Sequence, residues 1–300
     1  MLRRRRRKPD RSKFEAARAA FFAGAAEFAP HVTVETPLGT FLVATGDRKV
    51  GRQLFEREGI KEMKMLRRAA TVLEELHGTA AIEGRTFVDV GANIGTTTVA
   101  SLIGFPFGTA VSFEPDEENH RLLRANVLLN GLEERVTVVR AAVSDRVGKS
   151  ELARHARNSG AHMLVSADGM AELSADFRER VIVPVTTLDE CVADGTIDPA
   201  RTALLWLDAQ GQEGHVLLGA GTLTKRGVPV LTELYPAGLR NTGGLELLLD
   251  VASTAYDRFV DIRALRNPGQ LEPALRPVSE LASLASALEG ERHTDVLLLR

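Results

Sequence analysis

The stretch Phe87-Val-Asp-Val-Gly-Ala-Asn-Ile-Gly95 decides the fold of this chain. Together with Thr86, it begins as a short apolar run that stops at a glycine, which is typical of a buried strand ending in a turn. The acid inside the run, Asp89, is costly to bury unless it has a partner, so we interpret it as a candidate site residue. The alternative is a turn acid at the end of the strand. The residues from Asn93 to Ile103 can form the following helix.

The same rhythm of strand and helix continues along the chain. Helices are expected at 116–130, from 187 onward, between 208 and 225, and at 244–255. Further strands are expected at 110–114, 135–139, 181–186, 203–208, 229–233, 256–263 and 295–299. This alternation predicts an α/β fold, doubly wound, with a parallel sheet covered by helices on both faces. The last two strands could pair antiparallel at one edge of the sheet.

The residues before this rhythm have a different pattern. Residues 14–29 predict an amphipathic helix, 32–45 a β-hairpin around Pro37 and Gly39, and 50–77 a helix. We therefore divide the chain into three parts: a basic, disordered leader at 1–13, a helical and hairpin extension at 14–80, and a main domain at 81–300. Within the main domain, the polar stretch 144–180 is a possible lid insertion.

The charge of the chain is unevenly distributed. The 300 residues carry a formal net charge of −2, but residues 1–13 hold eight basic side chains and one acid. The remaining body is therefore acidic, which argues against a nucleic-acid-binding domain. The leader could contact nucleic acid or anionic lipid, or be a solvated terminus. The lone Cys191 excludes an internal disulfide and suits a cytoplasmic location, and no apolar run is long enough for a membrane span.

The ends of the expected strands indicate where a ligand binds, because α/β sheets bind ligands beyond the carboxyl ends of their strands. After the strand that ends at Val90, Gly91 and Gly95 are four residues apart, and Asn93 replaces the middle glycine of a dinucleotide-binding loop. A nucleoside without a pyrophosphate fits this loop better. After the next strand, Glu114 could accept hydrogen bonds from both hydroxyls of a ribose. The alternative for Glu114 is an acid that favours a helix start.

The residues around these positions carry a family resemblance. Residues 87–95 resemble the first motif of class I S-adenosylmethionine-dependent methyltransferases. They combine in family order with four motifs that resemble the FkbM methyltransferase family: Phe113-Glu-Pro-Asp116, Val183-Pro-Val-Thr-Thr-Leu-Asp189, Asp208-Ala-Gln-Gly-Gln-Glu213 and Leu217-Leu-Gly-Ala220. The resemblance covers about residues 32–260. It implies a mostly parallel, seven-stranded Rossmann-like sheet with an antiparallel last strand, and S-adenosylmethionine as the cofactor.

The resemblance also implies roles for individual residues. Asp89 and Gly91 would lie beside the amino-acid end of the cofactor, and Glu114 would hold the ribose hydroxyls. Ala141–Ala142 would pass near the adenine, and Asp208 would lie near the transferred methyl group. The complete set of expected cofactor-binding residues is Asp89, Gly91, Ala92, Asn93, Gly95, Glu114, Ala141, Ala142 and Asp208.

Methyl transfer from a sulfonium requires mainly alignment and a dry site, and a hydroxyl acceptor also needs a base or a metal ion. The expected catalytic residues are Asp208, Glu233 and Glu213. No spacing motif supports a metal site, so no metal is assigned. Many family members have a glutamate where this chain has Gln210, which weakens a metal or base role at that position.

Three histidines are further candidates for the base. His215 is two residues from Glu213 on an expected helix, so the two side chains point in different directions, and a packing role is the alternative. His155 and His162 lie in the polar stretch 144–180, where loop histidines are usually solvated.

We therefore expect an S-adenosylmethionine-dependent O-methyltransferase that acts on a hydroxyl of a small-molecule, sugar or natural-product acceptor. A nicotinamide-dependent oxidoreductase is one alternative, against which Asn93 and the terminal strand pair argue. A non-catalytic nucleoside-binding protein is the other alternative. The intact set of Asp89, Gly91, Glu114 and Asp208 argues against it.

Overall fold

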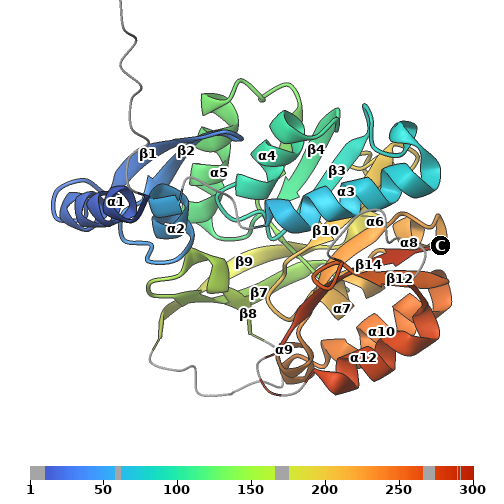
Figure 1. Ribbon diagram of the computed structural model, residues 1–300. Helices are drawn as coiled ribbons and strands as arrows, with labels where there is room; N and C mark the ends of the chain where they lie inside the picture. Colours follow the sequence, from blue (N-terminus) through green and yellow to red (C-terminus); the bar gives the residue numbers. More distant parts are fainter. Residues whose placement is uncertain (1–10, 58–61, 166–175, 266–273, 289, 291) are drawn as a thin grey trace, which may run out of the picture.

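The computed structural model describes residues 11–57, 62–165, 176–265, 274–288, 290 and 292–300. Within these ranges, eight strands form the central sheet in the order β13-β12-β14-β11-β10-β3-β4-β5 (Figure 1). The strands are β3 (Thr86–Val90), β4 (Thr109–Phe113), β5 (Val136–Val139), β10 (Thr202–Leu207), β11 (Val230–Leu234), β12 (Arg258–Asp261), β13 (Leu275–Pro277) and β14 (Thr294–Leu299). The five from β5 to β11 are parallel, and β14 runs antiparallel to both of its neighbours.

The doubly wound α/β fold and the antiparallel last strand are thus confirmed, and so is the antiparallel pairing of the last two expected strands, β12 and β14. Within the sheet β14 lies between β11 and β12, and the strand count is the one correction. The described sheet has eight strands where seven were expected, because β13 adds to the edge strand β12. This strand is only three residues long and ends at Pro277, which is tolerated at a sheet edge, so it carries no readable periodicity.

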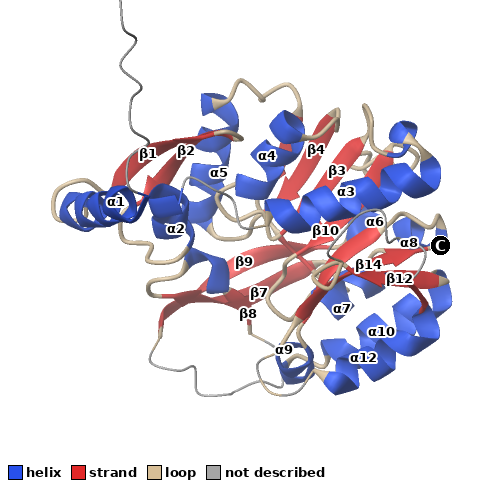
Figure 2. Ribbon diagram, viewed as in Figure 1, coloured by secondary structure: helices blue, strands red, loops and turns tan. Residues whose placement is uncertain are grey.

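Helices cover both faces of the sheet (Figure 2). One face carries α3 (Met63–His77), α4 (Thr96–Gly104) and α5 (Glu117–Leu129). The other face carries α6 (Leu188–Ala193), α7 (Glu213–Leu218), α8 (Gly221–Lys225), α9 (Pro236–Asn241), α10 (Gly244–Ala255) and α12 (Leu281–Ala287). None of the helices in the described ranges has both the length and the apolar character that a bilayer crossing requires.

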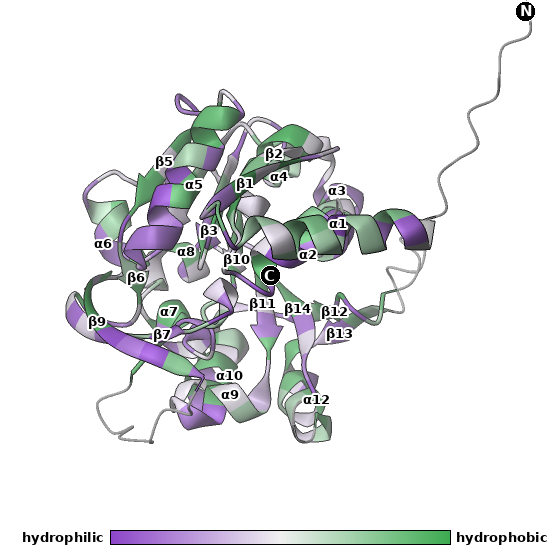
Figure 3. Ribbon diagram, turned by 90° about the vertical axis from the view of Figure 1, so that its left-hand side faces the viewer, coloured by the Kyte–Doolittle hydropathy of each residue, from purple (hydrophilic) through white to green (hydrophobic). Residues whose placement is uncertain are grey.

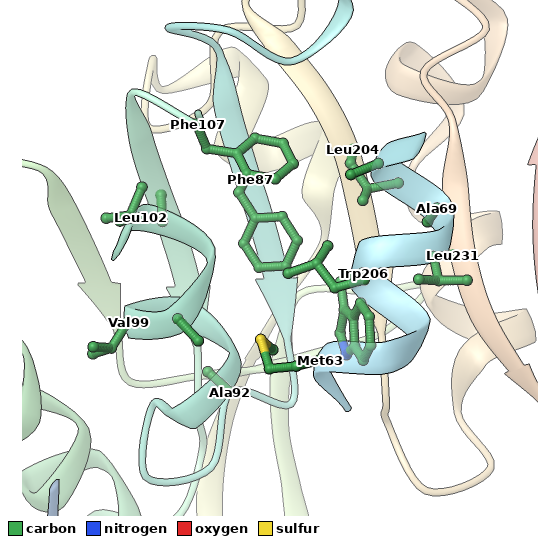
Figure 4. Close-up of a cluster of buried hydrophobic side chains, with 14 of the residues drawn as sticks. Met63, Ala69, Phe87, Ala92, Val99, Leu102, Phe107, Leu204, Trp206 and Leu231 are labelled. Atoms are coloured by element: carbon green, nitrogen blue, oxygen red, sulfur yellow. The ribbon is translucent and has the colours of Figure 1, made fainter. Parts of the chain in front are cut away.

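The core shows why β3 has no polar alternation. All five of its residues are buried, because a strand covered on both faces must be apolar on both. Phe87 packs with Phe107 and Trp206 on the side of α3 and α4 (Figure 4). Its neighbour Val88 belongs to the core on the opposite side. Successive residues of a strand therefore identify the face to which each side chain belongs.

The N-terminal extension packs against the main domain. It contains α1 (Arg11–Ala25), the hairpin of β1 (His31–Thr36) and β2 (Gly39–Ala44), and α2 (Val50–Arg57). The hairpin is confirmed, and it docks on α5 because Asn126 and Asn130 accept hydrogen bonds from the backbone of β2. The helix expected over 50–77 is two helices, α2 and α3, and residues 58–61 between them lie outside the described ranges. Of the leader expected at 1–13, residues 1–10 also lie outside them, whereas residues 11–13 belong to α1 and are helical.

The stretch 144–180 contributes to a second sheet, which the sequence did not indicate, and the strand expected at 181–186 belongs to this sheet and not to the central one. Its order is β6-β9-β7-β8, with β6 (Ala142–Val143), β7 (Gly148–His155), β8 (Met163–Leu164) and β9 (Phe177–Thr186). Much of β9 is hydrophilic and exposed (Figure 3), so only a small apolar cluster holds this sheet together. Residues 166–175, within the possible lid insertion, lie outside the described ranges.

Candidate active site

A cavity of about 570 Å³ lies beyond the carboxyl ends of β3, β4 and β10. This volume is within the usual range for small-molecule sites. Strand ends, α2 and the short helix η2 (Ser159–Ala161) all contribute to its wall. Of the residues expected from the sequence, Gly91, Ala92, Asn93, Glu114, Ala141, Ala142, Asp208 and Glu233 line the cavity, whereas Asp89, Gly95 and Glu213 do not.

The two glycines of the first loop have different tasks. Gly91 has φ 86°, and a Cβ there would lie 1.9 Å from the carbonyl oxygen of Asp208. No other residue allows the turn after β3 to pass so close to the end of β10. Gly95 has φ 84°, and its Cβ would lie 2.4 Å from Leu123 Cδ1. Gly95 therefore allows α4 to begin against α5, which explains why it lies behind the cavity wall.

Two non-glycine residues of the described chain have positive φ, Asn93 (52°) and Gln210 (51°), and both line the cavity. Asparagine tolerates the left-handed region better than most residues do. At Asn93 this conformation directs the backbone N–H to Glu114 Oε2, at 2.9 Å. The unusual backbone of the loop after β3 thus serves to hold the carboxylate that follows β4.

Glu114 is held from two sides. Its Oε1 accepts a hydrogen bond from the backbone N–H of Asp116 at 2.8 Å, and its Oε2 accepts the one from Asn93. The residue is only 5% exposed. Burial raises the pKa of this carboxyl group to about 8, and the two backbone donors oppose the rise. A carboxylate fixed in this way at a cavity wall can accept further hydrogen bonds from hydroxyl groups.

Asp89 lies under the cavity, on the face of the sheet that α4 covers. Its Oδ2 accepts a hydrogen bond from Thr98 Oγ1 at 2.6 Å, and within the described structure its Oδ1 is buried without a partner. Burial raises its pKa to about 7, and the nearby Asp208 carboxylate raises it further. A buried polar atom without a partner in the protein is the kind of position that a ligand or a water molecule satisfies.

The acids of the site share one face of the sheet. Each follows a core residue of that face by two positions: Asp89 follows Phe87, Asp208 follows Trp206, and Glu233 follows Leu231. Because these strands are parallel, the three acids gather at the carboxyl ends of β3, β10 and β11. Their mutual repulsion contributes to the raised pKa values of Asp89 and Glu233.

Glu233 lies among the other acids of the site. Burial raises its pKa to about 8, with further contributions from the carboxylates of Asp208, Glu213 and Asp295. Its Oε1 lies 3.4 Å from Nε2 of His293 and 3.9 Å from Nη2 of Arg263.

The aromatic neighbours of Glu233 belong to the same wall. Tyr235 meets the His293 ring edge-on, at 6.1 Å between centroids, and both residues line the cavity beside Glu233.

Glu213 has a structural position instead. It is 2% exposed, and its Oε1 accepts hydrogen bonds from the backbone of Ala209 (2.9 Å) and Gly211 (3.3 Å). Glu213 therefore stabilises the loop after β10 from the side away from the cavity, and this position does not favour the catalytic role expected for it. On the cavity side of the same loop, Gln210 Nε2 donates a hydrogen bond to Asp208 Oδ1 at 2.7 Å.

Of the three candidate histidines, His162 alone lines the cavity. His215 lies outside the cavity, with Nε2 2.9 Å from the carbonyl oxygen of Thr242, so its packing role is the better interpretation. His155 also lies outside. His162 lines the cavity, and its Nδ1 accepts a hydrogen bond from the backbone N–H of His155 at 3.1 Å. Burial lowers the pKa of His162, which favours the neutral ring.

Several wall residues were not found from the sequence. They are Lys49, Gln53 and Glu62 from the N-terminal part, Asn158 and Ser159 from η2 and the residue before it, and Tyr235 and His293 from the central sheet. The last two carried a usable signal. Tyr235 directly follows β11, and His293 directly precedes β14. Because β14 runs antiparallel to β11, it begins beside the carboxyl end of β11.

This combination defines a class. The features of a class I methyltransferase are present together. They are a doubly wound sheet with an antiparallel strand next to β11, a glycine turn after β3 and a fixed carboxylate after β4. The family model described as "Methyltransferase FkbM domain" matches residues 89–262, more than half of the chain. The chain therefore belongs to the FkbM methyltransferase family, whose cofactor is S-adenosylmethionine.

One curated relative shares about a quarter of its residues with this chain over the matched region. A similar curated protein is the 31-O-demethyl-FK506 methyltransferase FkbM of Streptomyces tacrolimicus, 28% identical over 165 residues, which cover 48% of this chain and 62% of the relative. The chain thus spans less than two thirds of that relative.

Solved structures are similar at still lower identity. The FkbM methyltransferase of Methylobacillus flagellatus is 16% identical with a TM-score of 0.43, covering 72% of this chain and 43% of that one. An O-methyltransferase of Bacillus cereus is 12% identical with a TM-score of 0.36, covering 81% and 82%.

Proposed function

We propose that the protein transfers the methyl group of S-adenosylmethionine to a hydroxyl oxygen of a small-molecule, sugar or natural-product acceptor. The observation that carries this proposal is one cavity whose wall combines the expected cofactor residues Gly91, Asn93 and Glu114 with the acids Asp208 and Glu233. The name of the Streptomyces tacrolimicus relative, a 31-O-demethyl-FK506 methyltransferase, supports an oxygen acceptor.

The residues at the first strand ends fit the cofactor. At Gly91 the Asp208 carbonyl fills the space that a Cβ would need, so glycine allows the turn to lie at the cavity wall beside Asp208. Glu114 would accept hydrogen bonds from the ribose hydroxyls, and Ala141–Ala142 would pass beside the adenine. The acidic edge of the sheet would favour a cation. S-adenosylmethionine supplies an activated methyl group on a positively charged sulfur.

The other end of the cavity would bind the acceptor. When the hydroxyl oxygen forms its bond to the methyl carbon and the carbon–sulfur bond breaks, the hydroxyl proton must move to a base. Glu233 is the residue proposed to take it up in its ionised form, because a carboxylate with a pKa of about 8 is a stronger base than an ordinary glutamate. Asp208, beside Glu233 and the glycine turn, would lie closest to the cationic centre.

Calorimetry followed by an acceptor screen tests this function. S-adenosylmethionine and S-adenosylhomocysteine should each bind with micromolar affinity, while NAD should give no heat. A panel of sugars, phenols and alicyclic alcohols is then screened for S-adenosylhomocysteine release. Binding of NAD together with no heat from either sulfur ligand would overturn the assignment. Cofactor binding with methyl transfer only to nitrogen or carbon acceptors would refute the choice of oxygen.

A further inference from the structure

A nearly buried arginine connects the second sheet to the cofactor loop. The side chain of Arg154, on β7, is 10% exposed and meets three acids. Its Nε lies 2.7 Å from Asp116 Oδ2, its Nη2 2.6 Å from Glu118 Oε2 and its Nη1 2.7 Å from Glu179 Oε1. These carboxylates raise the pKa of Arg154 although burial opposes the rise.

Of the three acids, Asp116 is the one that matters for the site. Its side chain is 2% exposed, whereas those of Glu118 and Glu179 are 62% and 46% exposed, so solvent screens the other two pairs much more. Arg178 also pairs with Glu118, at 3.0 Å. The buried pair of Arg154 and Asp116 is therefore the strong link in this network.

Asp116 in turn holds Glu114. The backbone N–H of Asp116 donates to Glu114 Oε1, and the Asp116 side chain caps α5 by accepting from the backbone N–H groups of Glu118 and Asn119, both at 3.0 Å. The side chain of Asn119 also favours the charged form of Glu114. Any shift of Asp116 would thus move the donors that orient the Glu114 carboxylate.

We propose that Arg154 is a positioning residue of the cofactor site, which acts through Asp116 to set the Glu114 carboxylate for the ribose hydroxyls. This inference rests on the proposed function. Arg154 does not line the cavity, so it has no direct contact with a ligand there. The planar guanidinium meets the three acids at once, with Nη2 donating a hydrogen bond to Asp116 Oδ1 at 3.3 Å while it also pairs with Glu118, and a lysine cannot reproduce this arrangement. The second sheet is thereby a working part of the cofactor site.

The test measures ribose recognition directly. Calorimetry is performed with S-adenosylhomocysteine and with its 2′-deoxy analogue on the full chain and on Arg154→Met, Arg154→Lys and the double variant Arg154→Met/Asp116→Asn. The double variant avoids an unpaired buried carboxylate and keeps a helix cap, because asparagine caps as well as aspartate does. Arg180→Met is the matched control, since Arg180 pairs with Glu151 at 3.0 Å on the exposed side of the same sheet.

The wild type should prefer S-adenosylhomocysteine over the 2′-deoxy analogue by about 10- to 150-fold, the range for a hydrogen bond to a charged group. Each Arg154 variant that folds should lose about tenfold in affinity for S-adenosylhomocysteine, a usual coupling between contacting residues, and should lose most of the preference. Arg180→Met should keep both values. A purely structural role would lower the melting temperature and leave the preference unchanged.

The outcomes distinguish two failures. An unchanged preference in a folded Arg154 variant overturns the positioning role. If Arg154→Met does not fold, Arg154→Lys and the double variant decide. If the wild type binds neither ligand, the proposed function fails first, whatever the variants do.

Discussion

Replacing Glu114 by Gln should weaken cofactor binding while the fold is kept. The carboxylate accepts backbone hydrogen bonds from Asn93 and Asp116, and an amide of the same shape retains an acceptor for only one of them. It also loses the negative charge that the ribose hydroxyls would meet. Hydrogen bonds to charged groups contribute about 1.5–3 kcal/mol, so S-adenosylhomocysteine affinity should fall by about 10- to 150-fold.

The pH dependence makes this prediction specific. With a pKa of about 8, the Glu114 carboxyl is only about one-tenth ionised at pH 7 in the free protein. Hydroxyl donors favour the ionised form, so this group should raise wild-type affinity by about tenfold between pH 7 and pH 9. Glu114→Gln has no such titration. The difference in affinity between the two proteins should therefore widen over this interval.

Isothermal titration calorimetry at pH 7, 8 and 9 measures both effects. Glu117→Gln is the control, because Glu117 lies three residues away at the exposed start of α5 and pairs with Arg121 on the surface. It should bind as the wild type does at every pH. If Glu114→Gln matched the control in affinity, or kept the wild-type pH dependence, Glu114 would have no part in ribose binding.

Three further predictions concern the same edge of the sheet. Gly91→Ala should destabilise the protein by more than about 3 kcal/mol in thermal melts, because its Cβ would overlap the Asp208 carbonyl. The control Gly131→Ala, which has open space around it, should cost only about 1 kcal/mol. Equal losses of stability in the two variants would contradict this packing. Asp208→Asn should slow methyl transfer at least tenfold in single-turnover assays and change S-adenosylhomocysteine affinity little, and equal losses would make it a cofactor contact only. Because Asp89 and Glu233 have pKa values raised to about 7 and about 8, the folded state holds more protons than the unfolded state, so the free energy of unfolding without ligand should fall from pH 5 to pH 8 in urea titrations; a rise would refute these shifts.

The sequence predicted the central sheet well for a physical reason. Strands buried on both faces must be continuous apolar runs, and those at β3, β10 and β11 are bounded by glycine, aspartate and proline. The helix expected at 244–255 is α10 with the same limits. The cavity residues near these strands followed from the rule that ligands bind at their carboxyl ends.

The strand expected at 181–186 is the second half of β9, but its place in a second sheet could not be predicted, because its partner β7 is mostly polar. Arg154 therefore resembled any other arginine of a polar stretch, and its burial depends on acids 36 to 38 positions earlier and 25 positions later in the chain. The polar stretch was expected to be a lid. It does contribute to the cavity wall, through η2, but it is part of a folded second sheet. Local patterns hold no information about such pairings.

The departure at Gln210 is explained by its neighbour. Many members of the family carry glutamate at this position, whereas here the amide donates a hydrogen bond to Asp208 at 2.7 Å. A glutamate could not donate it, and it would add a further negative charge at an edge where Asp89 and Glu233 already have raised pKa values. Gln210 thus relieves crowding among the acids and keeps Asp208 oriented. Because Gln210 is neutral, position 210 cannot supply an acid or a base. Asp208 and Glu233 are therefore the acidic groups that we propose to face the reacting atoms.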